Sequence, residues 1–301
     1  MRKRKITVSE IISYLGDKVF ACHGEIENIY IDNLADVAHT NENTLDWINP
    51  AKGNKQQMAE SSKARVLLVD ETIQPIAGKT LIVVKNPKVA LAMIGNAFFA
   101  DRYEPLIHPT AIISPNAKIG EGVYIGPYCV IDAATIGDGC IIESNVRIYG
   151  CVNMGKCCRI KSGAVLGGEG FGFEKDEDGN RFRFPQIGSL IIGDYVEIGG
   201  NTCIDRGALS DTIIGDYTKI NNLCHIAHNN IIGKNVEITG CVNVSGSNVI
   251  EDNVWLAPNS SVRGYIHIGK KAVLGMGAVA TKDIPAGETW VGNPAHRMEK
   301  K

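Results

Sequence analysis

The chain has 301 residues, of which 44% are hydrophobic and 21% charged, and its formal net charge is −2 at pH 7. This charge gives no basis for nucleic-acid binding, and the hydrophobic content is sufficient for a core in each of two domains. No stretch of the sequence is apolar enough to span a bilayer, and the basic residues 1–5 lack the apolar segment of a signal peptide. The sequence therefore predicts a cytoplasmic protein.

Residues 1–104 predict a small α/β domain. We expect a short helix over residues 6–15, where polar capping residues precede an apolar stretch. Residues 66–69 and 81–84 are continuous aliphatic runs and predict buried strands. Residues 87–99 have apolar side chains at helical spacing and predict a helix that closes the domain.

Between Ile107 and Ala280 an aliphatic residue occupies almost every sixth position. A period of six fits neither an α-helix nor simple strand alternation, but it fits a coil of three short strands joined by corners. The pattern predicts a left-handed parallel β-helix over residues 105–286, followed by a short tail, 287–301. The inward positions form three runs: Ile107, Ile113, Ile119, Ile125, Ile131, Ile136, Ile142, Ile148, Met154, Ile160 and Leu166; Ile192, Ile198 and Ile204; and Ile214, Ile220, Ile226, Ile232, Ile238, Val244, Ile250, Leu256, Val262, Ile268 and Leu274.

The nine cysteines do not predict disulfides or a metal site. Their number is odd, and Cys157 and Cys158 have no second pair at the spacing of metal ligands. Four cysteines occupy the small-residue position of a hexad, where cysteine packs as a compact hydrophobe. These four are Cys129, Cys140, Cys158 and Cys224.

Two segments interrupt the hexads, at residues 167–186 and 205–210. A β-helix tolerates insertions at its corners because they leave the stacked strands undisturbed, and such loops often carry function. The strongest chemical candidate lies in residues 221–229, where His225 and His228 both occupy positions that face away from the core. A histidine outside the core and beside several amides can act as a general base, although an isolated surface histidine more often has no such role.

The sequence resembles the UDP-3-O-acylglucosamine N-acyltransferases of lipid A biosynthesis over most of its length. The similarity extends more weakly through residues 1–104, at Asn49-Pro50 and Val84-Lys85-Asn86-Pro87. The motifs that carry the resemblance are Gly170-Phe171-Gly172-Phe173, Pro185-Gln186-Ile187-Gly188, Ile192-Gly193-Asp194, Val196-Glu197-Ile198-Gly199, Ile204-Asp205-Arg206-Gly207-Ala208-Leu209, Asp211-Thr212 and Ile226-Ala227-His228-Asn229.

The resemblance implies an N-acyltransferase that moves an acyl group from a thioester to the amine of a UDP-linked amino sugar. His228 is then the base that takes a proton from the amine, and the Gly246 N–H faces the developing oxyanion. A thioester is already activated, so the enzyme mainly aligns the unprotonated amine and places donors at the new charge. No metal, covalent nucleophile or permanently bound cofactor is expected.

The resemblance also implies partners and further site residues. The co-substrate is acyl carrier protein or coenzyme A carrying the acyl group, and the assembly is a homotrimer with active sites in clefts between neighbouring β-helices. The residues expected at the nucleotide sugar are Trp47, Asn49, Asn221, Asn222, His225 and Asn229. The residues expected at the acyl donor are Gly264, Tyr265, Met276 and Ala278.

The sequence departs from the family pattern near the expected base-binding site. Asp46 and Lys52 stand where the family has two aromatics that enclose the uracil, and Trp47 is the only aromatic nearby. Trp47 is expected either to stack on a base from a shifted position or to belong to the core. Asn221 stands where the family often has aspartate, and Tyr265 where it has a second active-site histidine.

Two alternative functions remain open at this point. Residues 290–296 resemble the ending of coenzyme A-dependent sugar acetyltransferases, and Ala278 replaces a methionine common near the acyl pocket. These features favour a short-chain acyl-CoA-dependent N-acyltransferase acting on a nucleotide-linked amino dideoxy sugar, such as a dTDP sugar, for surface polysaccharide. The other alternative is a β-helix that serves only as a binding module.

Overall fold

The computed structural model describes residues 5–34 and 39–298, so the basic opening segment lies outside the described residues except for Lys5. The chain divides into two compact units, Met1–Arg102 and Tyr103–Lys301. In the described ranges, no helix has the length and apolar character needed to cross a membrane.

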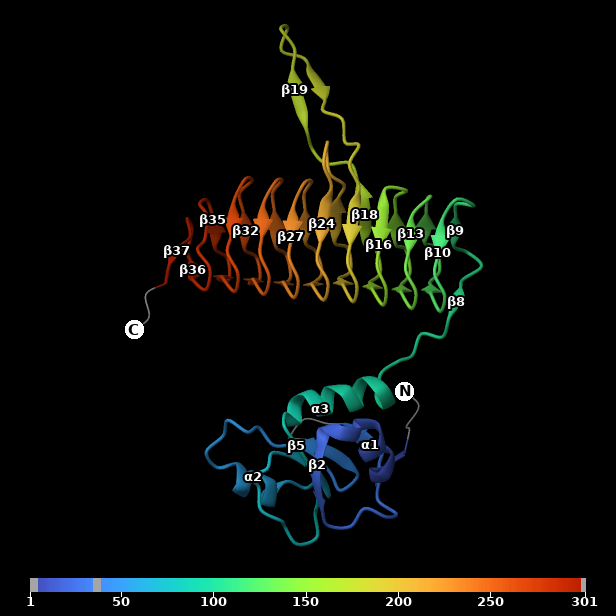
Figure 1. Cartoon of the computed structure of the whole chain (residues 1–301), viewed down its shortest axis with the longest axis vertical. Helices are drawn as coiled ribbons and strands as arrows, with labels where there is room; N and C mark the ends of the chain where they lie inside the picture. The colour runs from blue at the N-terminus through green and yellow to red at the C-terminus, as the bar shows by residue number, and fades with distance from the viewer. Residues whose placement is uncertain (1–4, 35–38, 299–301) are drawn as a thin grey trace. The chain divides into compact units, whose positions relative to one another are not determined.

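Over residues 5–34 and 39–102, the first unit contains a five-stranded sheet and three α-helices (Figure 1). Strand β2 is antiparallel to β7, whereas β7, β6, β5 and β4 are mutually parallel. The sheet order is β2 (Val19–His23), β7 (Thr80–Val84), β6 (Val66–Val69), β5 (Thr44–Trp47) and β4 (Asn33–Leu34). The predicted strands at 66–69 and 81–84 are thus confirmed as its buried centre.

The helices of the first unit begin at residues that can cap them. Helix α1 (Val8–Leu15) begins after Thr7, whose hydroxyl accepts a hydrogen bond from the Glu10 N–H while the Glu10 carboxylate accepts one from the Thr7 N–H. Helix α3 (Pro87–Ile94) begins after Asn86 and continues as a π-helical turn, Gly95–Phe99. The remaining elements are α2 (Lys55–Ser61), a 3₁₀ turn at Gly16–Lys18, and the antiparallel pair β1 (Ile6–Thr7) and β3 (Tyr30–Ile31).

The second unit is a left-handed parallel β-helix with three faces, as the hexads predict (Figure 1). Face 1 consists of β8 (Leu106–Ile107), β11 (Tyr124–Ile125), β14 (Ile141–Ile142), β17 (Arg159–Ile160), β22 (Glu197–Ile198), β25 (Lys219–Ile220), β28 (Glu237–Ile238), β31 (Trp255–Leu256), β34 (Val273–Leu274), β36 (Thr289–Val291) and the antiparallel β37 (His296–Arg297). The expected tail therefore adds two strands to this face.

The other two faces are entirely parallel in the described residues. Face 2 consists of β9 (Ile112–Ile113), β12 (Val130–Ile131), β15 (Arg147–Ile148), β18 (Val165–Gly168), β23 (Cys203–Asp205), β26 (His225–Ile226), β29 (Asn243–Val244), β32 (Ser261–Val262) and β35 (Val279–Ala280). Face 3 consists of β10 (Lys118–Ile119), β13 (Thr135–Ile136), β16 (Val152–Met154), β21 (Leu190–Ile192), β24 (Thr212–Ile214), β27 (Ile231–Ile232), β30 (Val249–Ile250) and β33 (His267–Ile268).

The inward aliphatic residues stack into one continuous core between the three faces. Ile107 is an exception to the predicted pattern, because it is 50% exposed. It belongs to β8, the last strand of face 1, which has a neighbour on one side only. A terminal coil lacks the stacked partner that covers each inner coil, so its inward residue stays accessible.

The corners use left-handed backbone at residues other than glycine. Asn229, Asn235, Cys241 and Ser247 follow one another at intervals of six and have φ values of 60°, 53°, 60° and 65°. Asparagine tolerates this conformation better than most residues, which explains its frequency at these corners. All nine cysteines are free, and the four assigned to packing are buried, as predicted. No group of three or more His, Cys, Asp and Glu side chains in the described ranges is arranged to hold a metal ion.

The interruption at residues 167–186 connects face 2 to face 3 through a projecting hairpin, seen at the top of Figure 1. Its antiparallel strands are β19 (Phe173–Lys175) and β20 (Arg181–Arg183). The edge of the β-helix between faces 2 and 3 is called edge B below and includes residues 227–230 and 245–248. The edge between faces 1 and 2 is called edge A and includes residues 221–224 and 275–278.

Candidate active site

His228 lies on edge B, and its hydrogen bonding determines which ring nitrogen carries a proton. Its Nδ1 is 2.8 Å from Asn229 Oδ1. The same Asn229 oxygen accepts a hydrogen bond of 3.1 Å from the Ala208 N–H, and the Asn229 Nδ2 donates to the Ser210 carbonyl at 2.8 Å. Because the Ala208 N–H can only donate, the Asn229 oxygen must face it, and His228 Nδ1 must donate to that oxygen. The neutral imidazole therefore has its lone pair at Nε2.

Asn229 is held so firmly that it can fix the imidazole. Both ends of its side-chain amide are bonded, and its backbone N–H donates to Thr212 Oγ1 at 2.8 Å. Its backbone has a φ of 60°, in the left-handed region that asparagine tolerates. The segment 205–210, predicted to be a functional loop, supplies the Ala208 and Ser210 contacts.

Two glycines place bare backbone against the His228 ring. A Cβ built on Gly246, one coil further along edge B, would lie 2.8 Å from His228 Cε1 and 3.1 Å from Nε2. A Cβ built on Gly170, in the inserted segment, would lie 2.7 Å from His228 Cδ2. A side chain at either position would displace the imidazole, so both sites require glycine.

Gly246 also supplies a free hydrogen-bond donor beside the imidazole. The N–H groups on either side of it are used, because Ser245 donates to Val262 and Ser247 donates to the His228 carbonyl, each at 3.0 Å. Within residues 5–34 and 39–298, no group accepts a hydrogen bond from the Gly246 N–H. This donor is therefore available to a ligand oxygen.

Buried asparagines join the coil of His228 to the coil of Gly246. Asn230 and Asn248 occupy the small-residue position of their hexads and are fully buried. Asn230 Nδ2 donates to the Ala227 carbonyl at 2.6 Å and to the Ser245 carbonyl at 3.0 Å, while its Oδ1 accepts from the Asn248 N–H at 3.0 Å. Neither residue is predicted from the hexads as part of the site, although a polar side chain at a core position is a signal that the sequence contains.

Asp205 and His225 form a second titratable pair on face 2. Asp205 Oδ2 is 3.8 Å from His225 Nε2, which is longer than a hydrogen bond, and the Asp205 side chain is 14% exposed. Burial raises the pKa of Asp205 to about 7 and lowers the pKa of His225. The resemblance places His225 at the nucleotide sugar, whereas Asp205 belongs to a shared motif that assigns it no role.

The expected acyl-donor residues divide between the two edges. Gly264 and Tyr265 lie on edge B, where the Tyr265 N–H donates to the Gly246 carbonyl at 3.2 Å and the Tyr265 side chain is 84% exposed. Met276 lies on edge A and is 74% exposed, and Ala278, on the same edge, is fully buried. The structure therefore groups Gly264 and Tyr265 with His228, and places Met276 and Ala278 on a different edge of the same chain.

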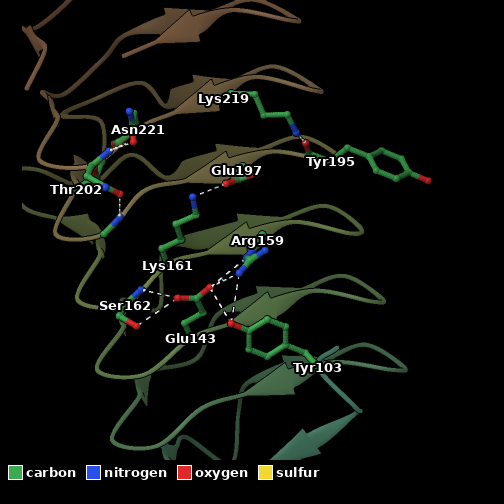
Figure 2. A network of polar contacts seen from close by, with 12 residues as sticks. Tyr103, Glu143, Arg159, Lys161, Ser162, Tyr195, Glu197, Thr202, Lys219 and Asn221 are labelled. Carbon is green, nitrogen blue, oxygen red and sulfur yellow. Dashed lines mark hydrogen bonds and ion pairs between the residues drawn. The ribbon is translucent and has the colours of Figure 1, made fainter. Parts of the chain in front are cut away.

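Asn221 and Asn222 also lie on edge A rather than beside His228. The Asn221 carbonyl accepts a hydrogen bond from Thr202 Oγ1 at 2.7 Å, and its side-chain oxygen accepts one from the Asn222 N–H at 2.7 Å. Figure 2 shows Asn221 beside Thr202 in a series of polar contacts that follows the outside of the β-helix. Asn221 also lines a shallow groove on face 1 with Lys219 and Glu237.

The best-connected member of that series is Glu143 (Figure 2). Its Oε1 accepts hydrogen bonds from Arg159 Nη2 at 2.7 Å and from the Tyr103 hydroxyl at 3.2 Å, and its Oε2 accepts from Ser162 Oγ at 3.3 Å. Burial alone would raise the pKa of Glu143, but the hydrogen bond and charge of Arg159 outweigh it and the pKa is lowered. These contacts hold successive coils of face 1 together.

Trp47 and Asn49 belong to the first unit. Trp47 is partly buried and packs against the hydrophobic cluster that contains Leu45 and Leu68. This packing favours the core interpretation of Trp47 over stacking on a base. Asn49 uses its Oδ1 to accept a hydrogen bond of 3.0 Å from the Ala51 N–H.

Comparisons with known proteins agree with the β-helical fold. Residues 104–133 match the family model described as bacterial transferase hexapeptide (six repeats). Two solved structures are similar to 64% of this chain and are themselves covered to 73%: one is of LpxA, and the other is of a UDP-N-acetylglucosamine O-acyltransferase (LpxA). The structure from Acinetobacter baumannii is 31% identical with a TM-score of 0.59, and that from Moraxella catarrhalis is 29% identical with a TM-score of 0.58.

Relatives in sequence identify the family more specifically than the repeat model and the solved structures do. UDP-3-O-acylglucosamine N-acyltransferase 1 of Francisella tularensis is 36% identical over 253 residues, which are 76% of this chain and 72% of that protein. UDP-3-O-acylglucosamine N-acyltransferase of Coxiella burnetii is 34% identical over 226 residues, which are 67% of this chain and 65% of that protein. The resemblance read from the motifs is confirmed, and the chain belongs to the UDP-3-O-acylglucosamine N-acyltransferase family.

Proposed function

We propose that the protein is an N-acyltransferase that moves an acyl group from a thioester to the amine of a UDP-linked amino sugar. The observation that carries this proposal is the His228 imidazole. Its Nδ1 is bonded to Asn229, and its Nε2 would lie 3.1 Å from a Cβ built on Gly246, whose backbone N–H is unpaired among the described residues. A base beside an oxyanion donor is the minimum that acyl transfer from a thioester requires. The names of the curated relatives supply the substrate class.

The reaction at this site balances with His228 as the sole proton carrier. The amine nitrogen attacks the thioester carbonyl carbon, His228 Nε2 takes one proton from that nitrogen, and the carbonyl electrons move to oxygen. The Gly246 N–H donates to the resulting oxyanion. The carbon–sulfur bond then breaks, and the leaving thiolate receives the proton from His228. One donor at the oxyanion typically contributes about 100- to 1,000-fold to kcat.

The proposed donor is a 3-hydroxyacyl group carried by acyl carrier protein, and coenzyme A is the alternative carrier. Both carriers present their thioester at the end of a flexible phosphopantetheine arm, so the chemistry at His228 is the same for either. Both are cytoplasmic, as is the nucleotide sugar, and we propose the same location for the enzyme. No permanently bound cofactor enters the mechanism.

We further propose a homotrimer in which neighbouring β-helices form the active sites. The expected site residues of one chain lie on two edges, with His228 and Gly246 on edge B and with Asn221 and Met276 on edge A. A cyclic assembly apposes two different surfaces of neighbouring copies. Edge B of one copy facing edge A of the next would unite the two sets in one cleft.

The substrate class is tested by ligand-induced stabilisation followed by product analysis. A ligand that binds the folded state raises the melting temperature, so coenzyme A, acyl carrier protein, UDP-sugars and dTDP-linked amino sugars are compared. Stabilisation by acyl carrier protein and a UDP-sugar, with N-acylated UDP-glucosamine detected by mass spectrometry, is the expected result. Stabilisation by coenzyme A and a dTDP-sugar alone, without acylation of the UDP-sugar, would contradict it.

A further inference from the structure

Gln186 carries a buried side-chain oxygen with no hydrogen-bond partner. The residue lies where the inserted segment returns to the β-helix after β20, and it is only 5% exposed. Its Oε1 is fully buried, and none of the described residues donates a hydrogen bond to it. Buried polar atoms in native structures are nearly always paired, so an unpaired acceptor calls for an explanation.

The unpaired oxygen lies beside the catalytic edge of His228. A Cβ built on Gly170 would be 2.9 Å from Gln186 Oε1 and 2.7 Å from His228 Cδ2. Cδ2 is bonded to Nε2, the nitrogen that has the free lone pair. Gln186 Oε1 and the Nε2 edge of the imidazole therefore both lie against Gly170, which has no side chain to separate them.

The orientation of the Gln186 amide is set by its surroundings. Its Nε2 donates to the Phe184 carbonyl at 3.3 Å, which can only accept, so the amide oxygen is the end that faces Gly170. The next residue, Ile187, donates its N–H to the Ala208 carbonyl at 2.7 Å. Ala208 in turn donates to Asn229, which fixes His228. One hydrogen-bonded chain thus positions both the acceptor and the base.

We propose that Gln186 Oε1 binds the attacking amine by accepting its second N–H, an inference that rests on the proposed function. A neutral primary amine has two hydrogens on nitrogen. One passes to His228 Nε2 when the carbon–nitrogen bond forms, and the other remains on nitrogen in the amide product. Gln186 holds the remaining hydrogen, which turns the nitrogen lone pair toward the thioester carbonyl and keeps the reacting atoms aligned.

The same contact makes Gln186 a determinant of the choice between amine and alcohol acceptors. A hydroxyl nucleophile has one hydrogen, which His228 must take, and therefore leaves Gln186 Oε1 unpaired. A site with a buried hydrogen-bonding group discriminates strongly against a substrate that lacks the matching group. Gln186 thus favours transfer to nitrogen over transfer to oxygen.

The test replaces Gln186 with methionine, which has a similar length and no hydrogen-bonding oxygen. The variant removes an unpaired buried acceptor, which should stabilise the folded protein, and also removes the 3.3 Å hydrogen bond from Gln186 Nε2 to the Phe184 carbonyl, which should cost about 1 kcal/mol. The melting temperature should therefore change little. With UDP-3-O-acylglucosamine and 3-hydroxyacyl-acyl carrier protein, kcat/KM should fall about 10-fold or more, mainly through kcat. The ratio of activity on this substrate to activity on UDP-3-O-acylglucose, its 2-hydroxy analogue, should fall as well. The control is Phe182→Ala in the same hairpin, where Phe182 is 62% exposed. It should change neither kcat/KM nor the ratio of the two activities.

The outcomes separate this inference from the proposed function. An active wild-type enzyme whose Gln186→Met variant keeps full kcat/KM overturns the role of Gln186 and leaves the N-acyltransferase assignment intact. A clear drop in melting temperature in Gln186→Met assigns the residue to the scaffold and also overturns its role. A wild-type enzyme inactive on UDP-3-O-acylglucosamine overturns the proposed function and this inference with it.

Discussion

His228 Nδ1 lies 2.8 Å from Asn229 Oδ1, and this contact decides which nitrogen of the imidazole can act as a base. Asn229 is bonded through both ends of its amide, to Ala208 and to Ser210, so it cannot rotate to accept the other tautomer. The neighbouring residue in the sequence therefore performs the orienting role that a separate carboxylate performs in many hydrolases.

Replacing Asn229 with glycine tests this tautomer control. Glycine adopts the φ of 60° at this corner without strain, so the substitution removes the amide and keeps the backbone path. We expect kcat to fall about 100-fold or more, as when an orienting group is lost from a histidine base. The control is Asn235→Gly, six residues further along, at an exposed corner with a φ of 53°. Equal kcat values for the two variants would show that Asn229 does not orient His228.

A side chain at Gly246 should disturb the base directly. A Cβ at this position would lie 2.8 Å from His228 Cε1, so the Gly246→Ala variant must displace the imidazole. A displacement near 1 Å can reduce turnover about 100-fold. Gly240→Ala is the matched control, because a Cβ there meets nothing closer than 3.8 Å. We expect kcat to fall only in Gly246→Ala, and similar kcat values in both variants would refute the placement of His228 against Gly246.

The hexad period was enough to predict the faces, the inward residues and the position of His228 outside the core. Each coil repeats the same environment, so the sequence position within a hexad determines whether a side chain points in or out. The repeat does not predict where stacking ends, which is why Ile107 was wrongly expected to be buried. It also does not describe segments that leave the repeat.

The site residues that the hexads do not predict lie in such segments or at positions that depart from the pattern. Gly170 and Gln186 reach His228 through an inserted segment whose path depends on its hairpin and on contacts with the 205–210 loop. Asp205 is the last residue of strand β23 and occupies an outward position, where sequence alone does not indicate burial. The roles assigned to Trp47, Asn49 and the acyl-donor residues depend on bound substrate, so they remain predictions.

The buried carboxyl of Asp205 should make stability depend on pH. Burial raises its folded-state pKa from the ordinary 3.8 to about 7, so the folded protein retains a proton that the unfolded chain has released. Its contribution to stability is therefore complete below the unfolded value and is lost as pH rises through about 7. His225, the titratable group facing it, has a pKa lowered by burial, so its own contribution to stability increases as pH rises toward the unfolded value and offsets part of this loss.

Asp205→Asn removes that pH dependence. We expect the melting temperature of the variant relative to wild type to increase from pH 4 to about pH 7 and to remain constant above it. Each kcal/mol corresponds to about 2–4 °C for a unit of this size. Differential scanning calorimetry across this range measures the difference. A difference that does not change with pH would mean that Asp205 is ionised throughout.

The contacts of Glu143 should make the free energy of unfolding depend on pH in the opposite direction. The pKa of Glu143 is lowered in the folded protein, so its contribution is present above the unfolded value and is lost as pH falls through the folded value. Glu143→Gln weakens the bonds to Arg159 and Tyr103 and should cost about 1–3 kcal/mol at neutral pH. The deficit should shrink under acid conditions. Glu197→Gln, at the more exposed ion pair with Lys161, is the control and should cost about 1 kcal/mol or less.

The most direct test of the account is the turnover of His228→Ala measured together with its melting temperature. His228 lies outside the core of the β-helix, so the variant should melt within a few degrees of wild type. With UDP-3-O-acylglucosamine and 3-hydroxyacyl-acyl carrier protein, we predict a loss of kcat of about 100-fold or more, because the proton acceptor is absent. A variant that retains most of its turnover, or that loses stability and activity together, would contradict the assignment of His228 as the base.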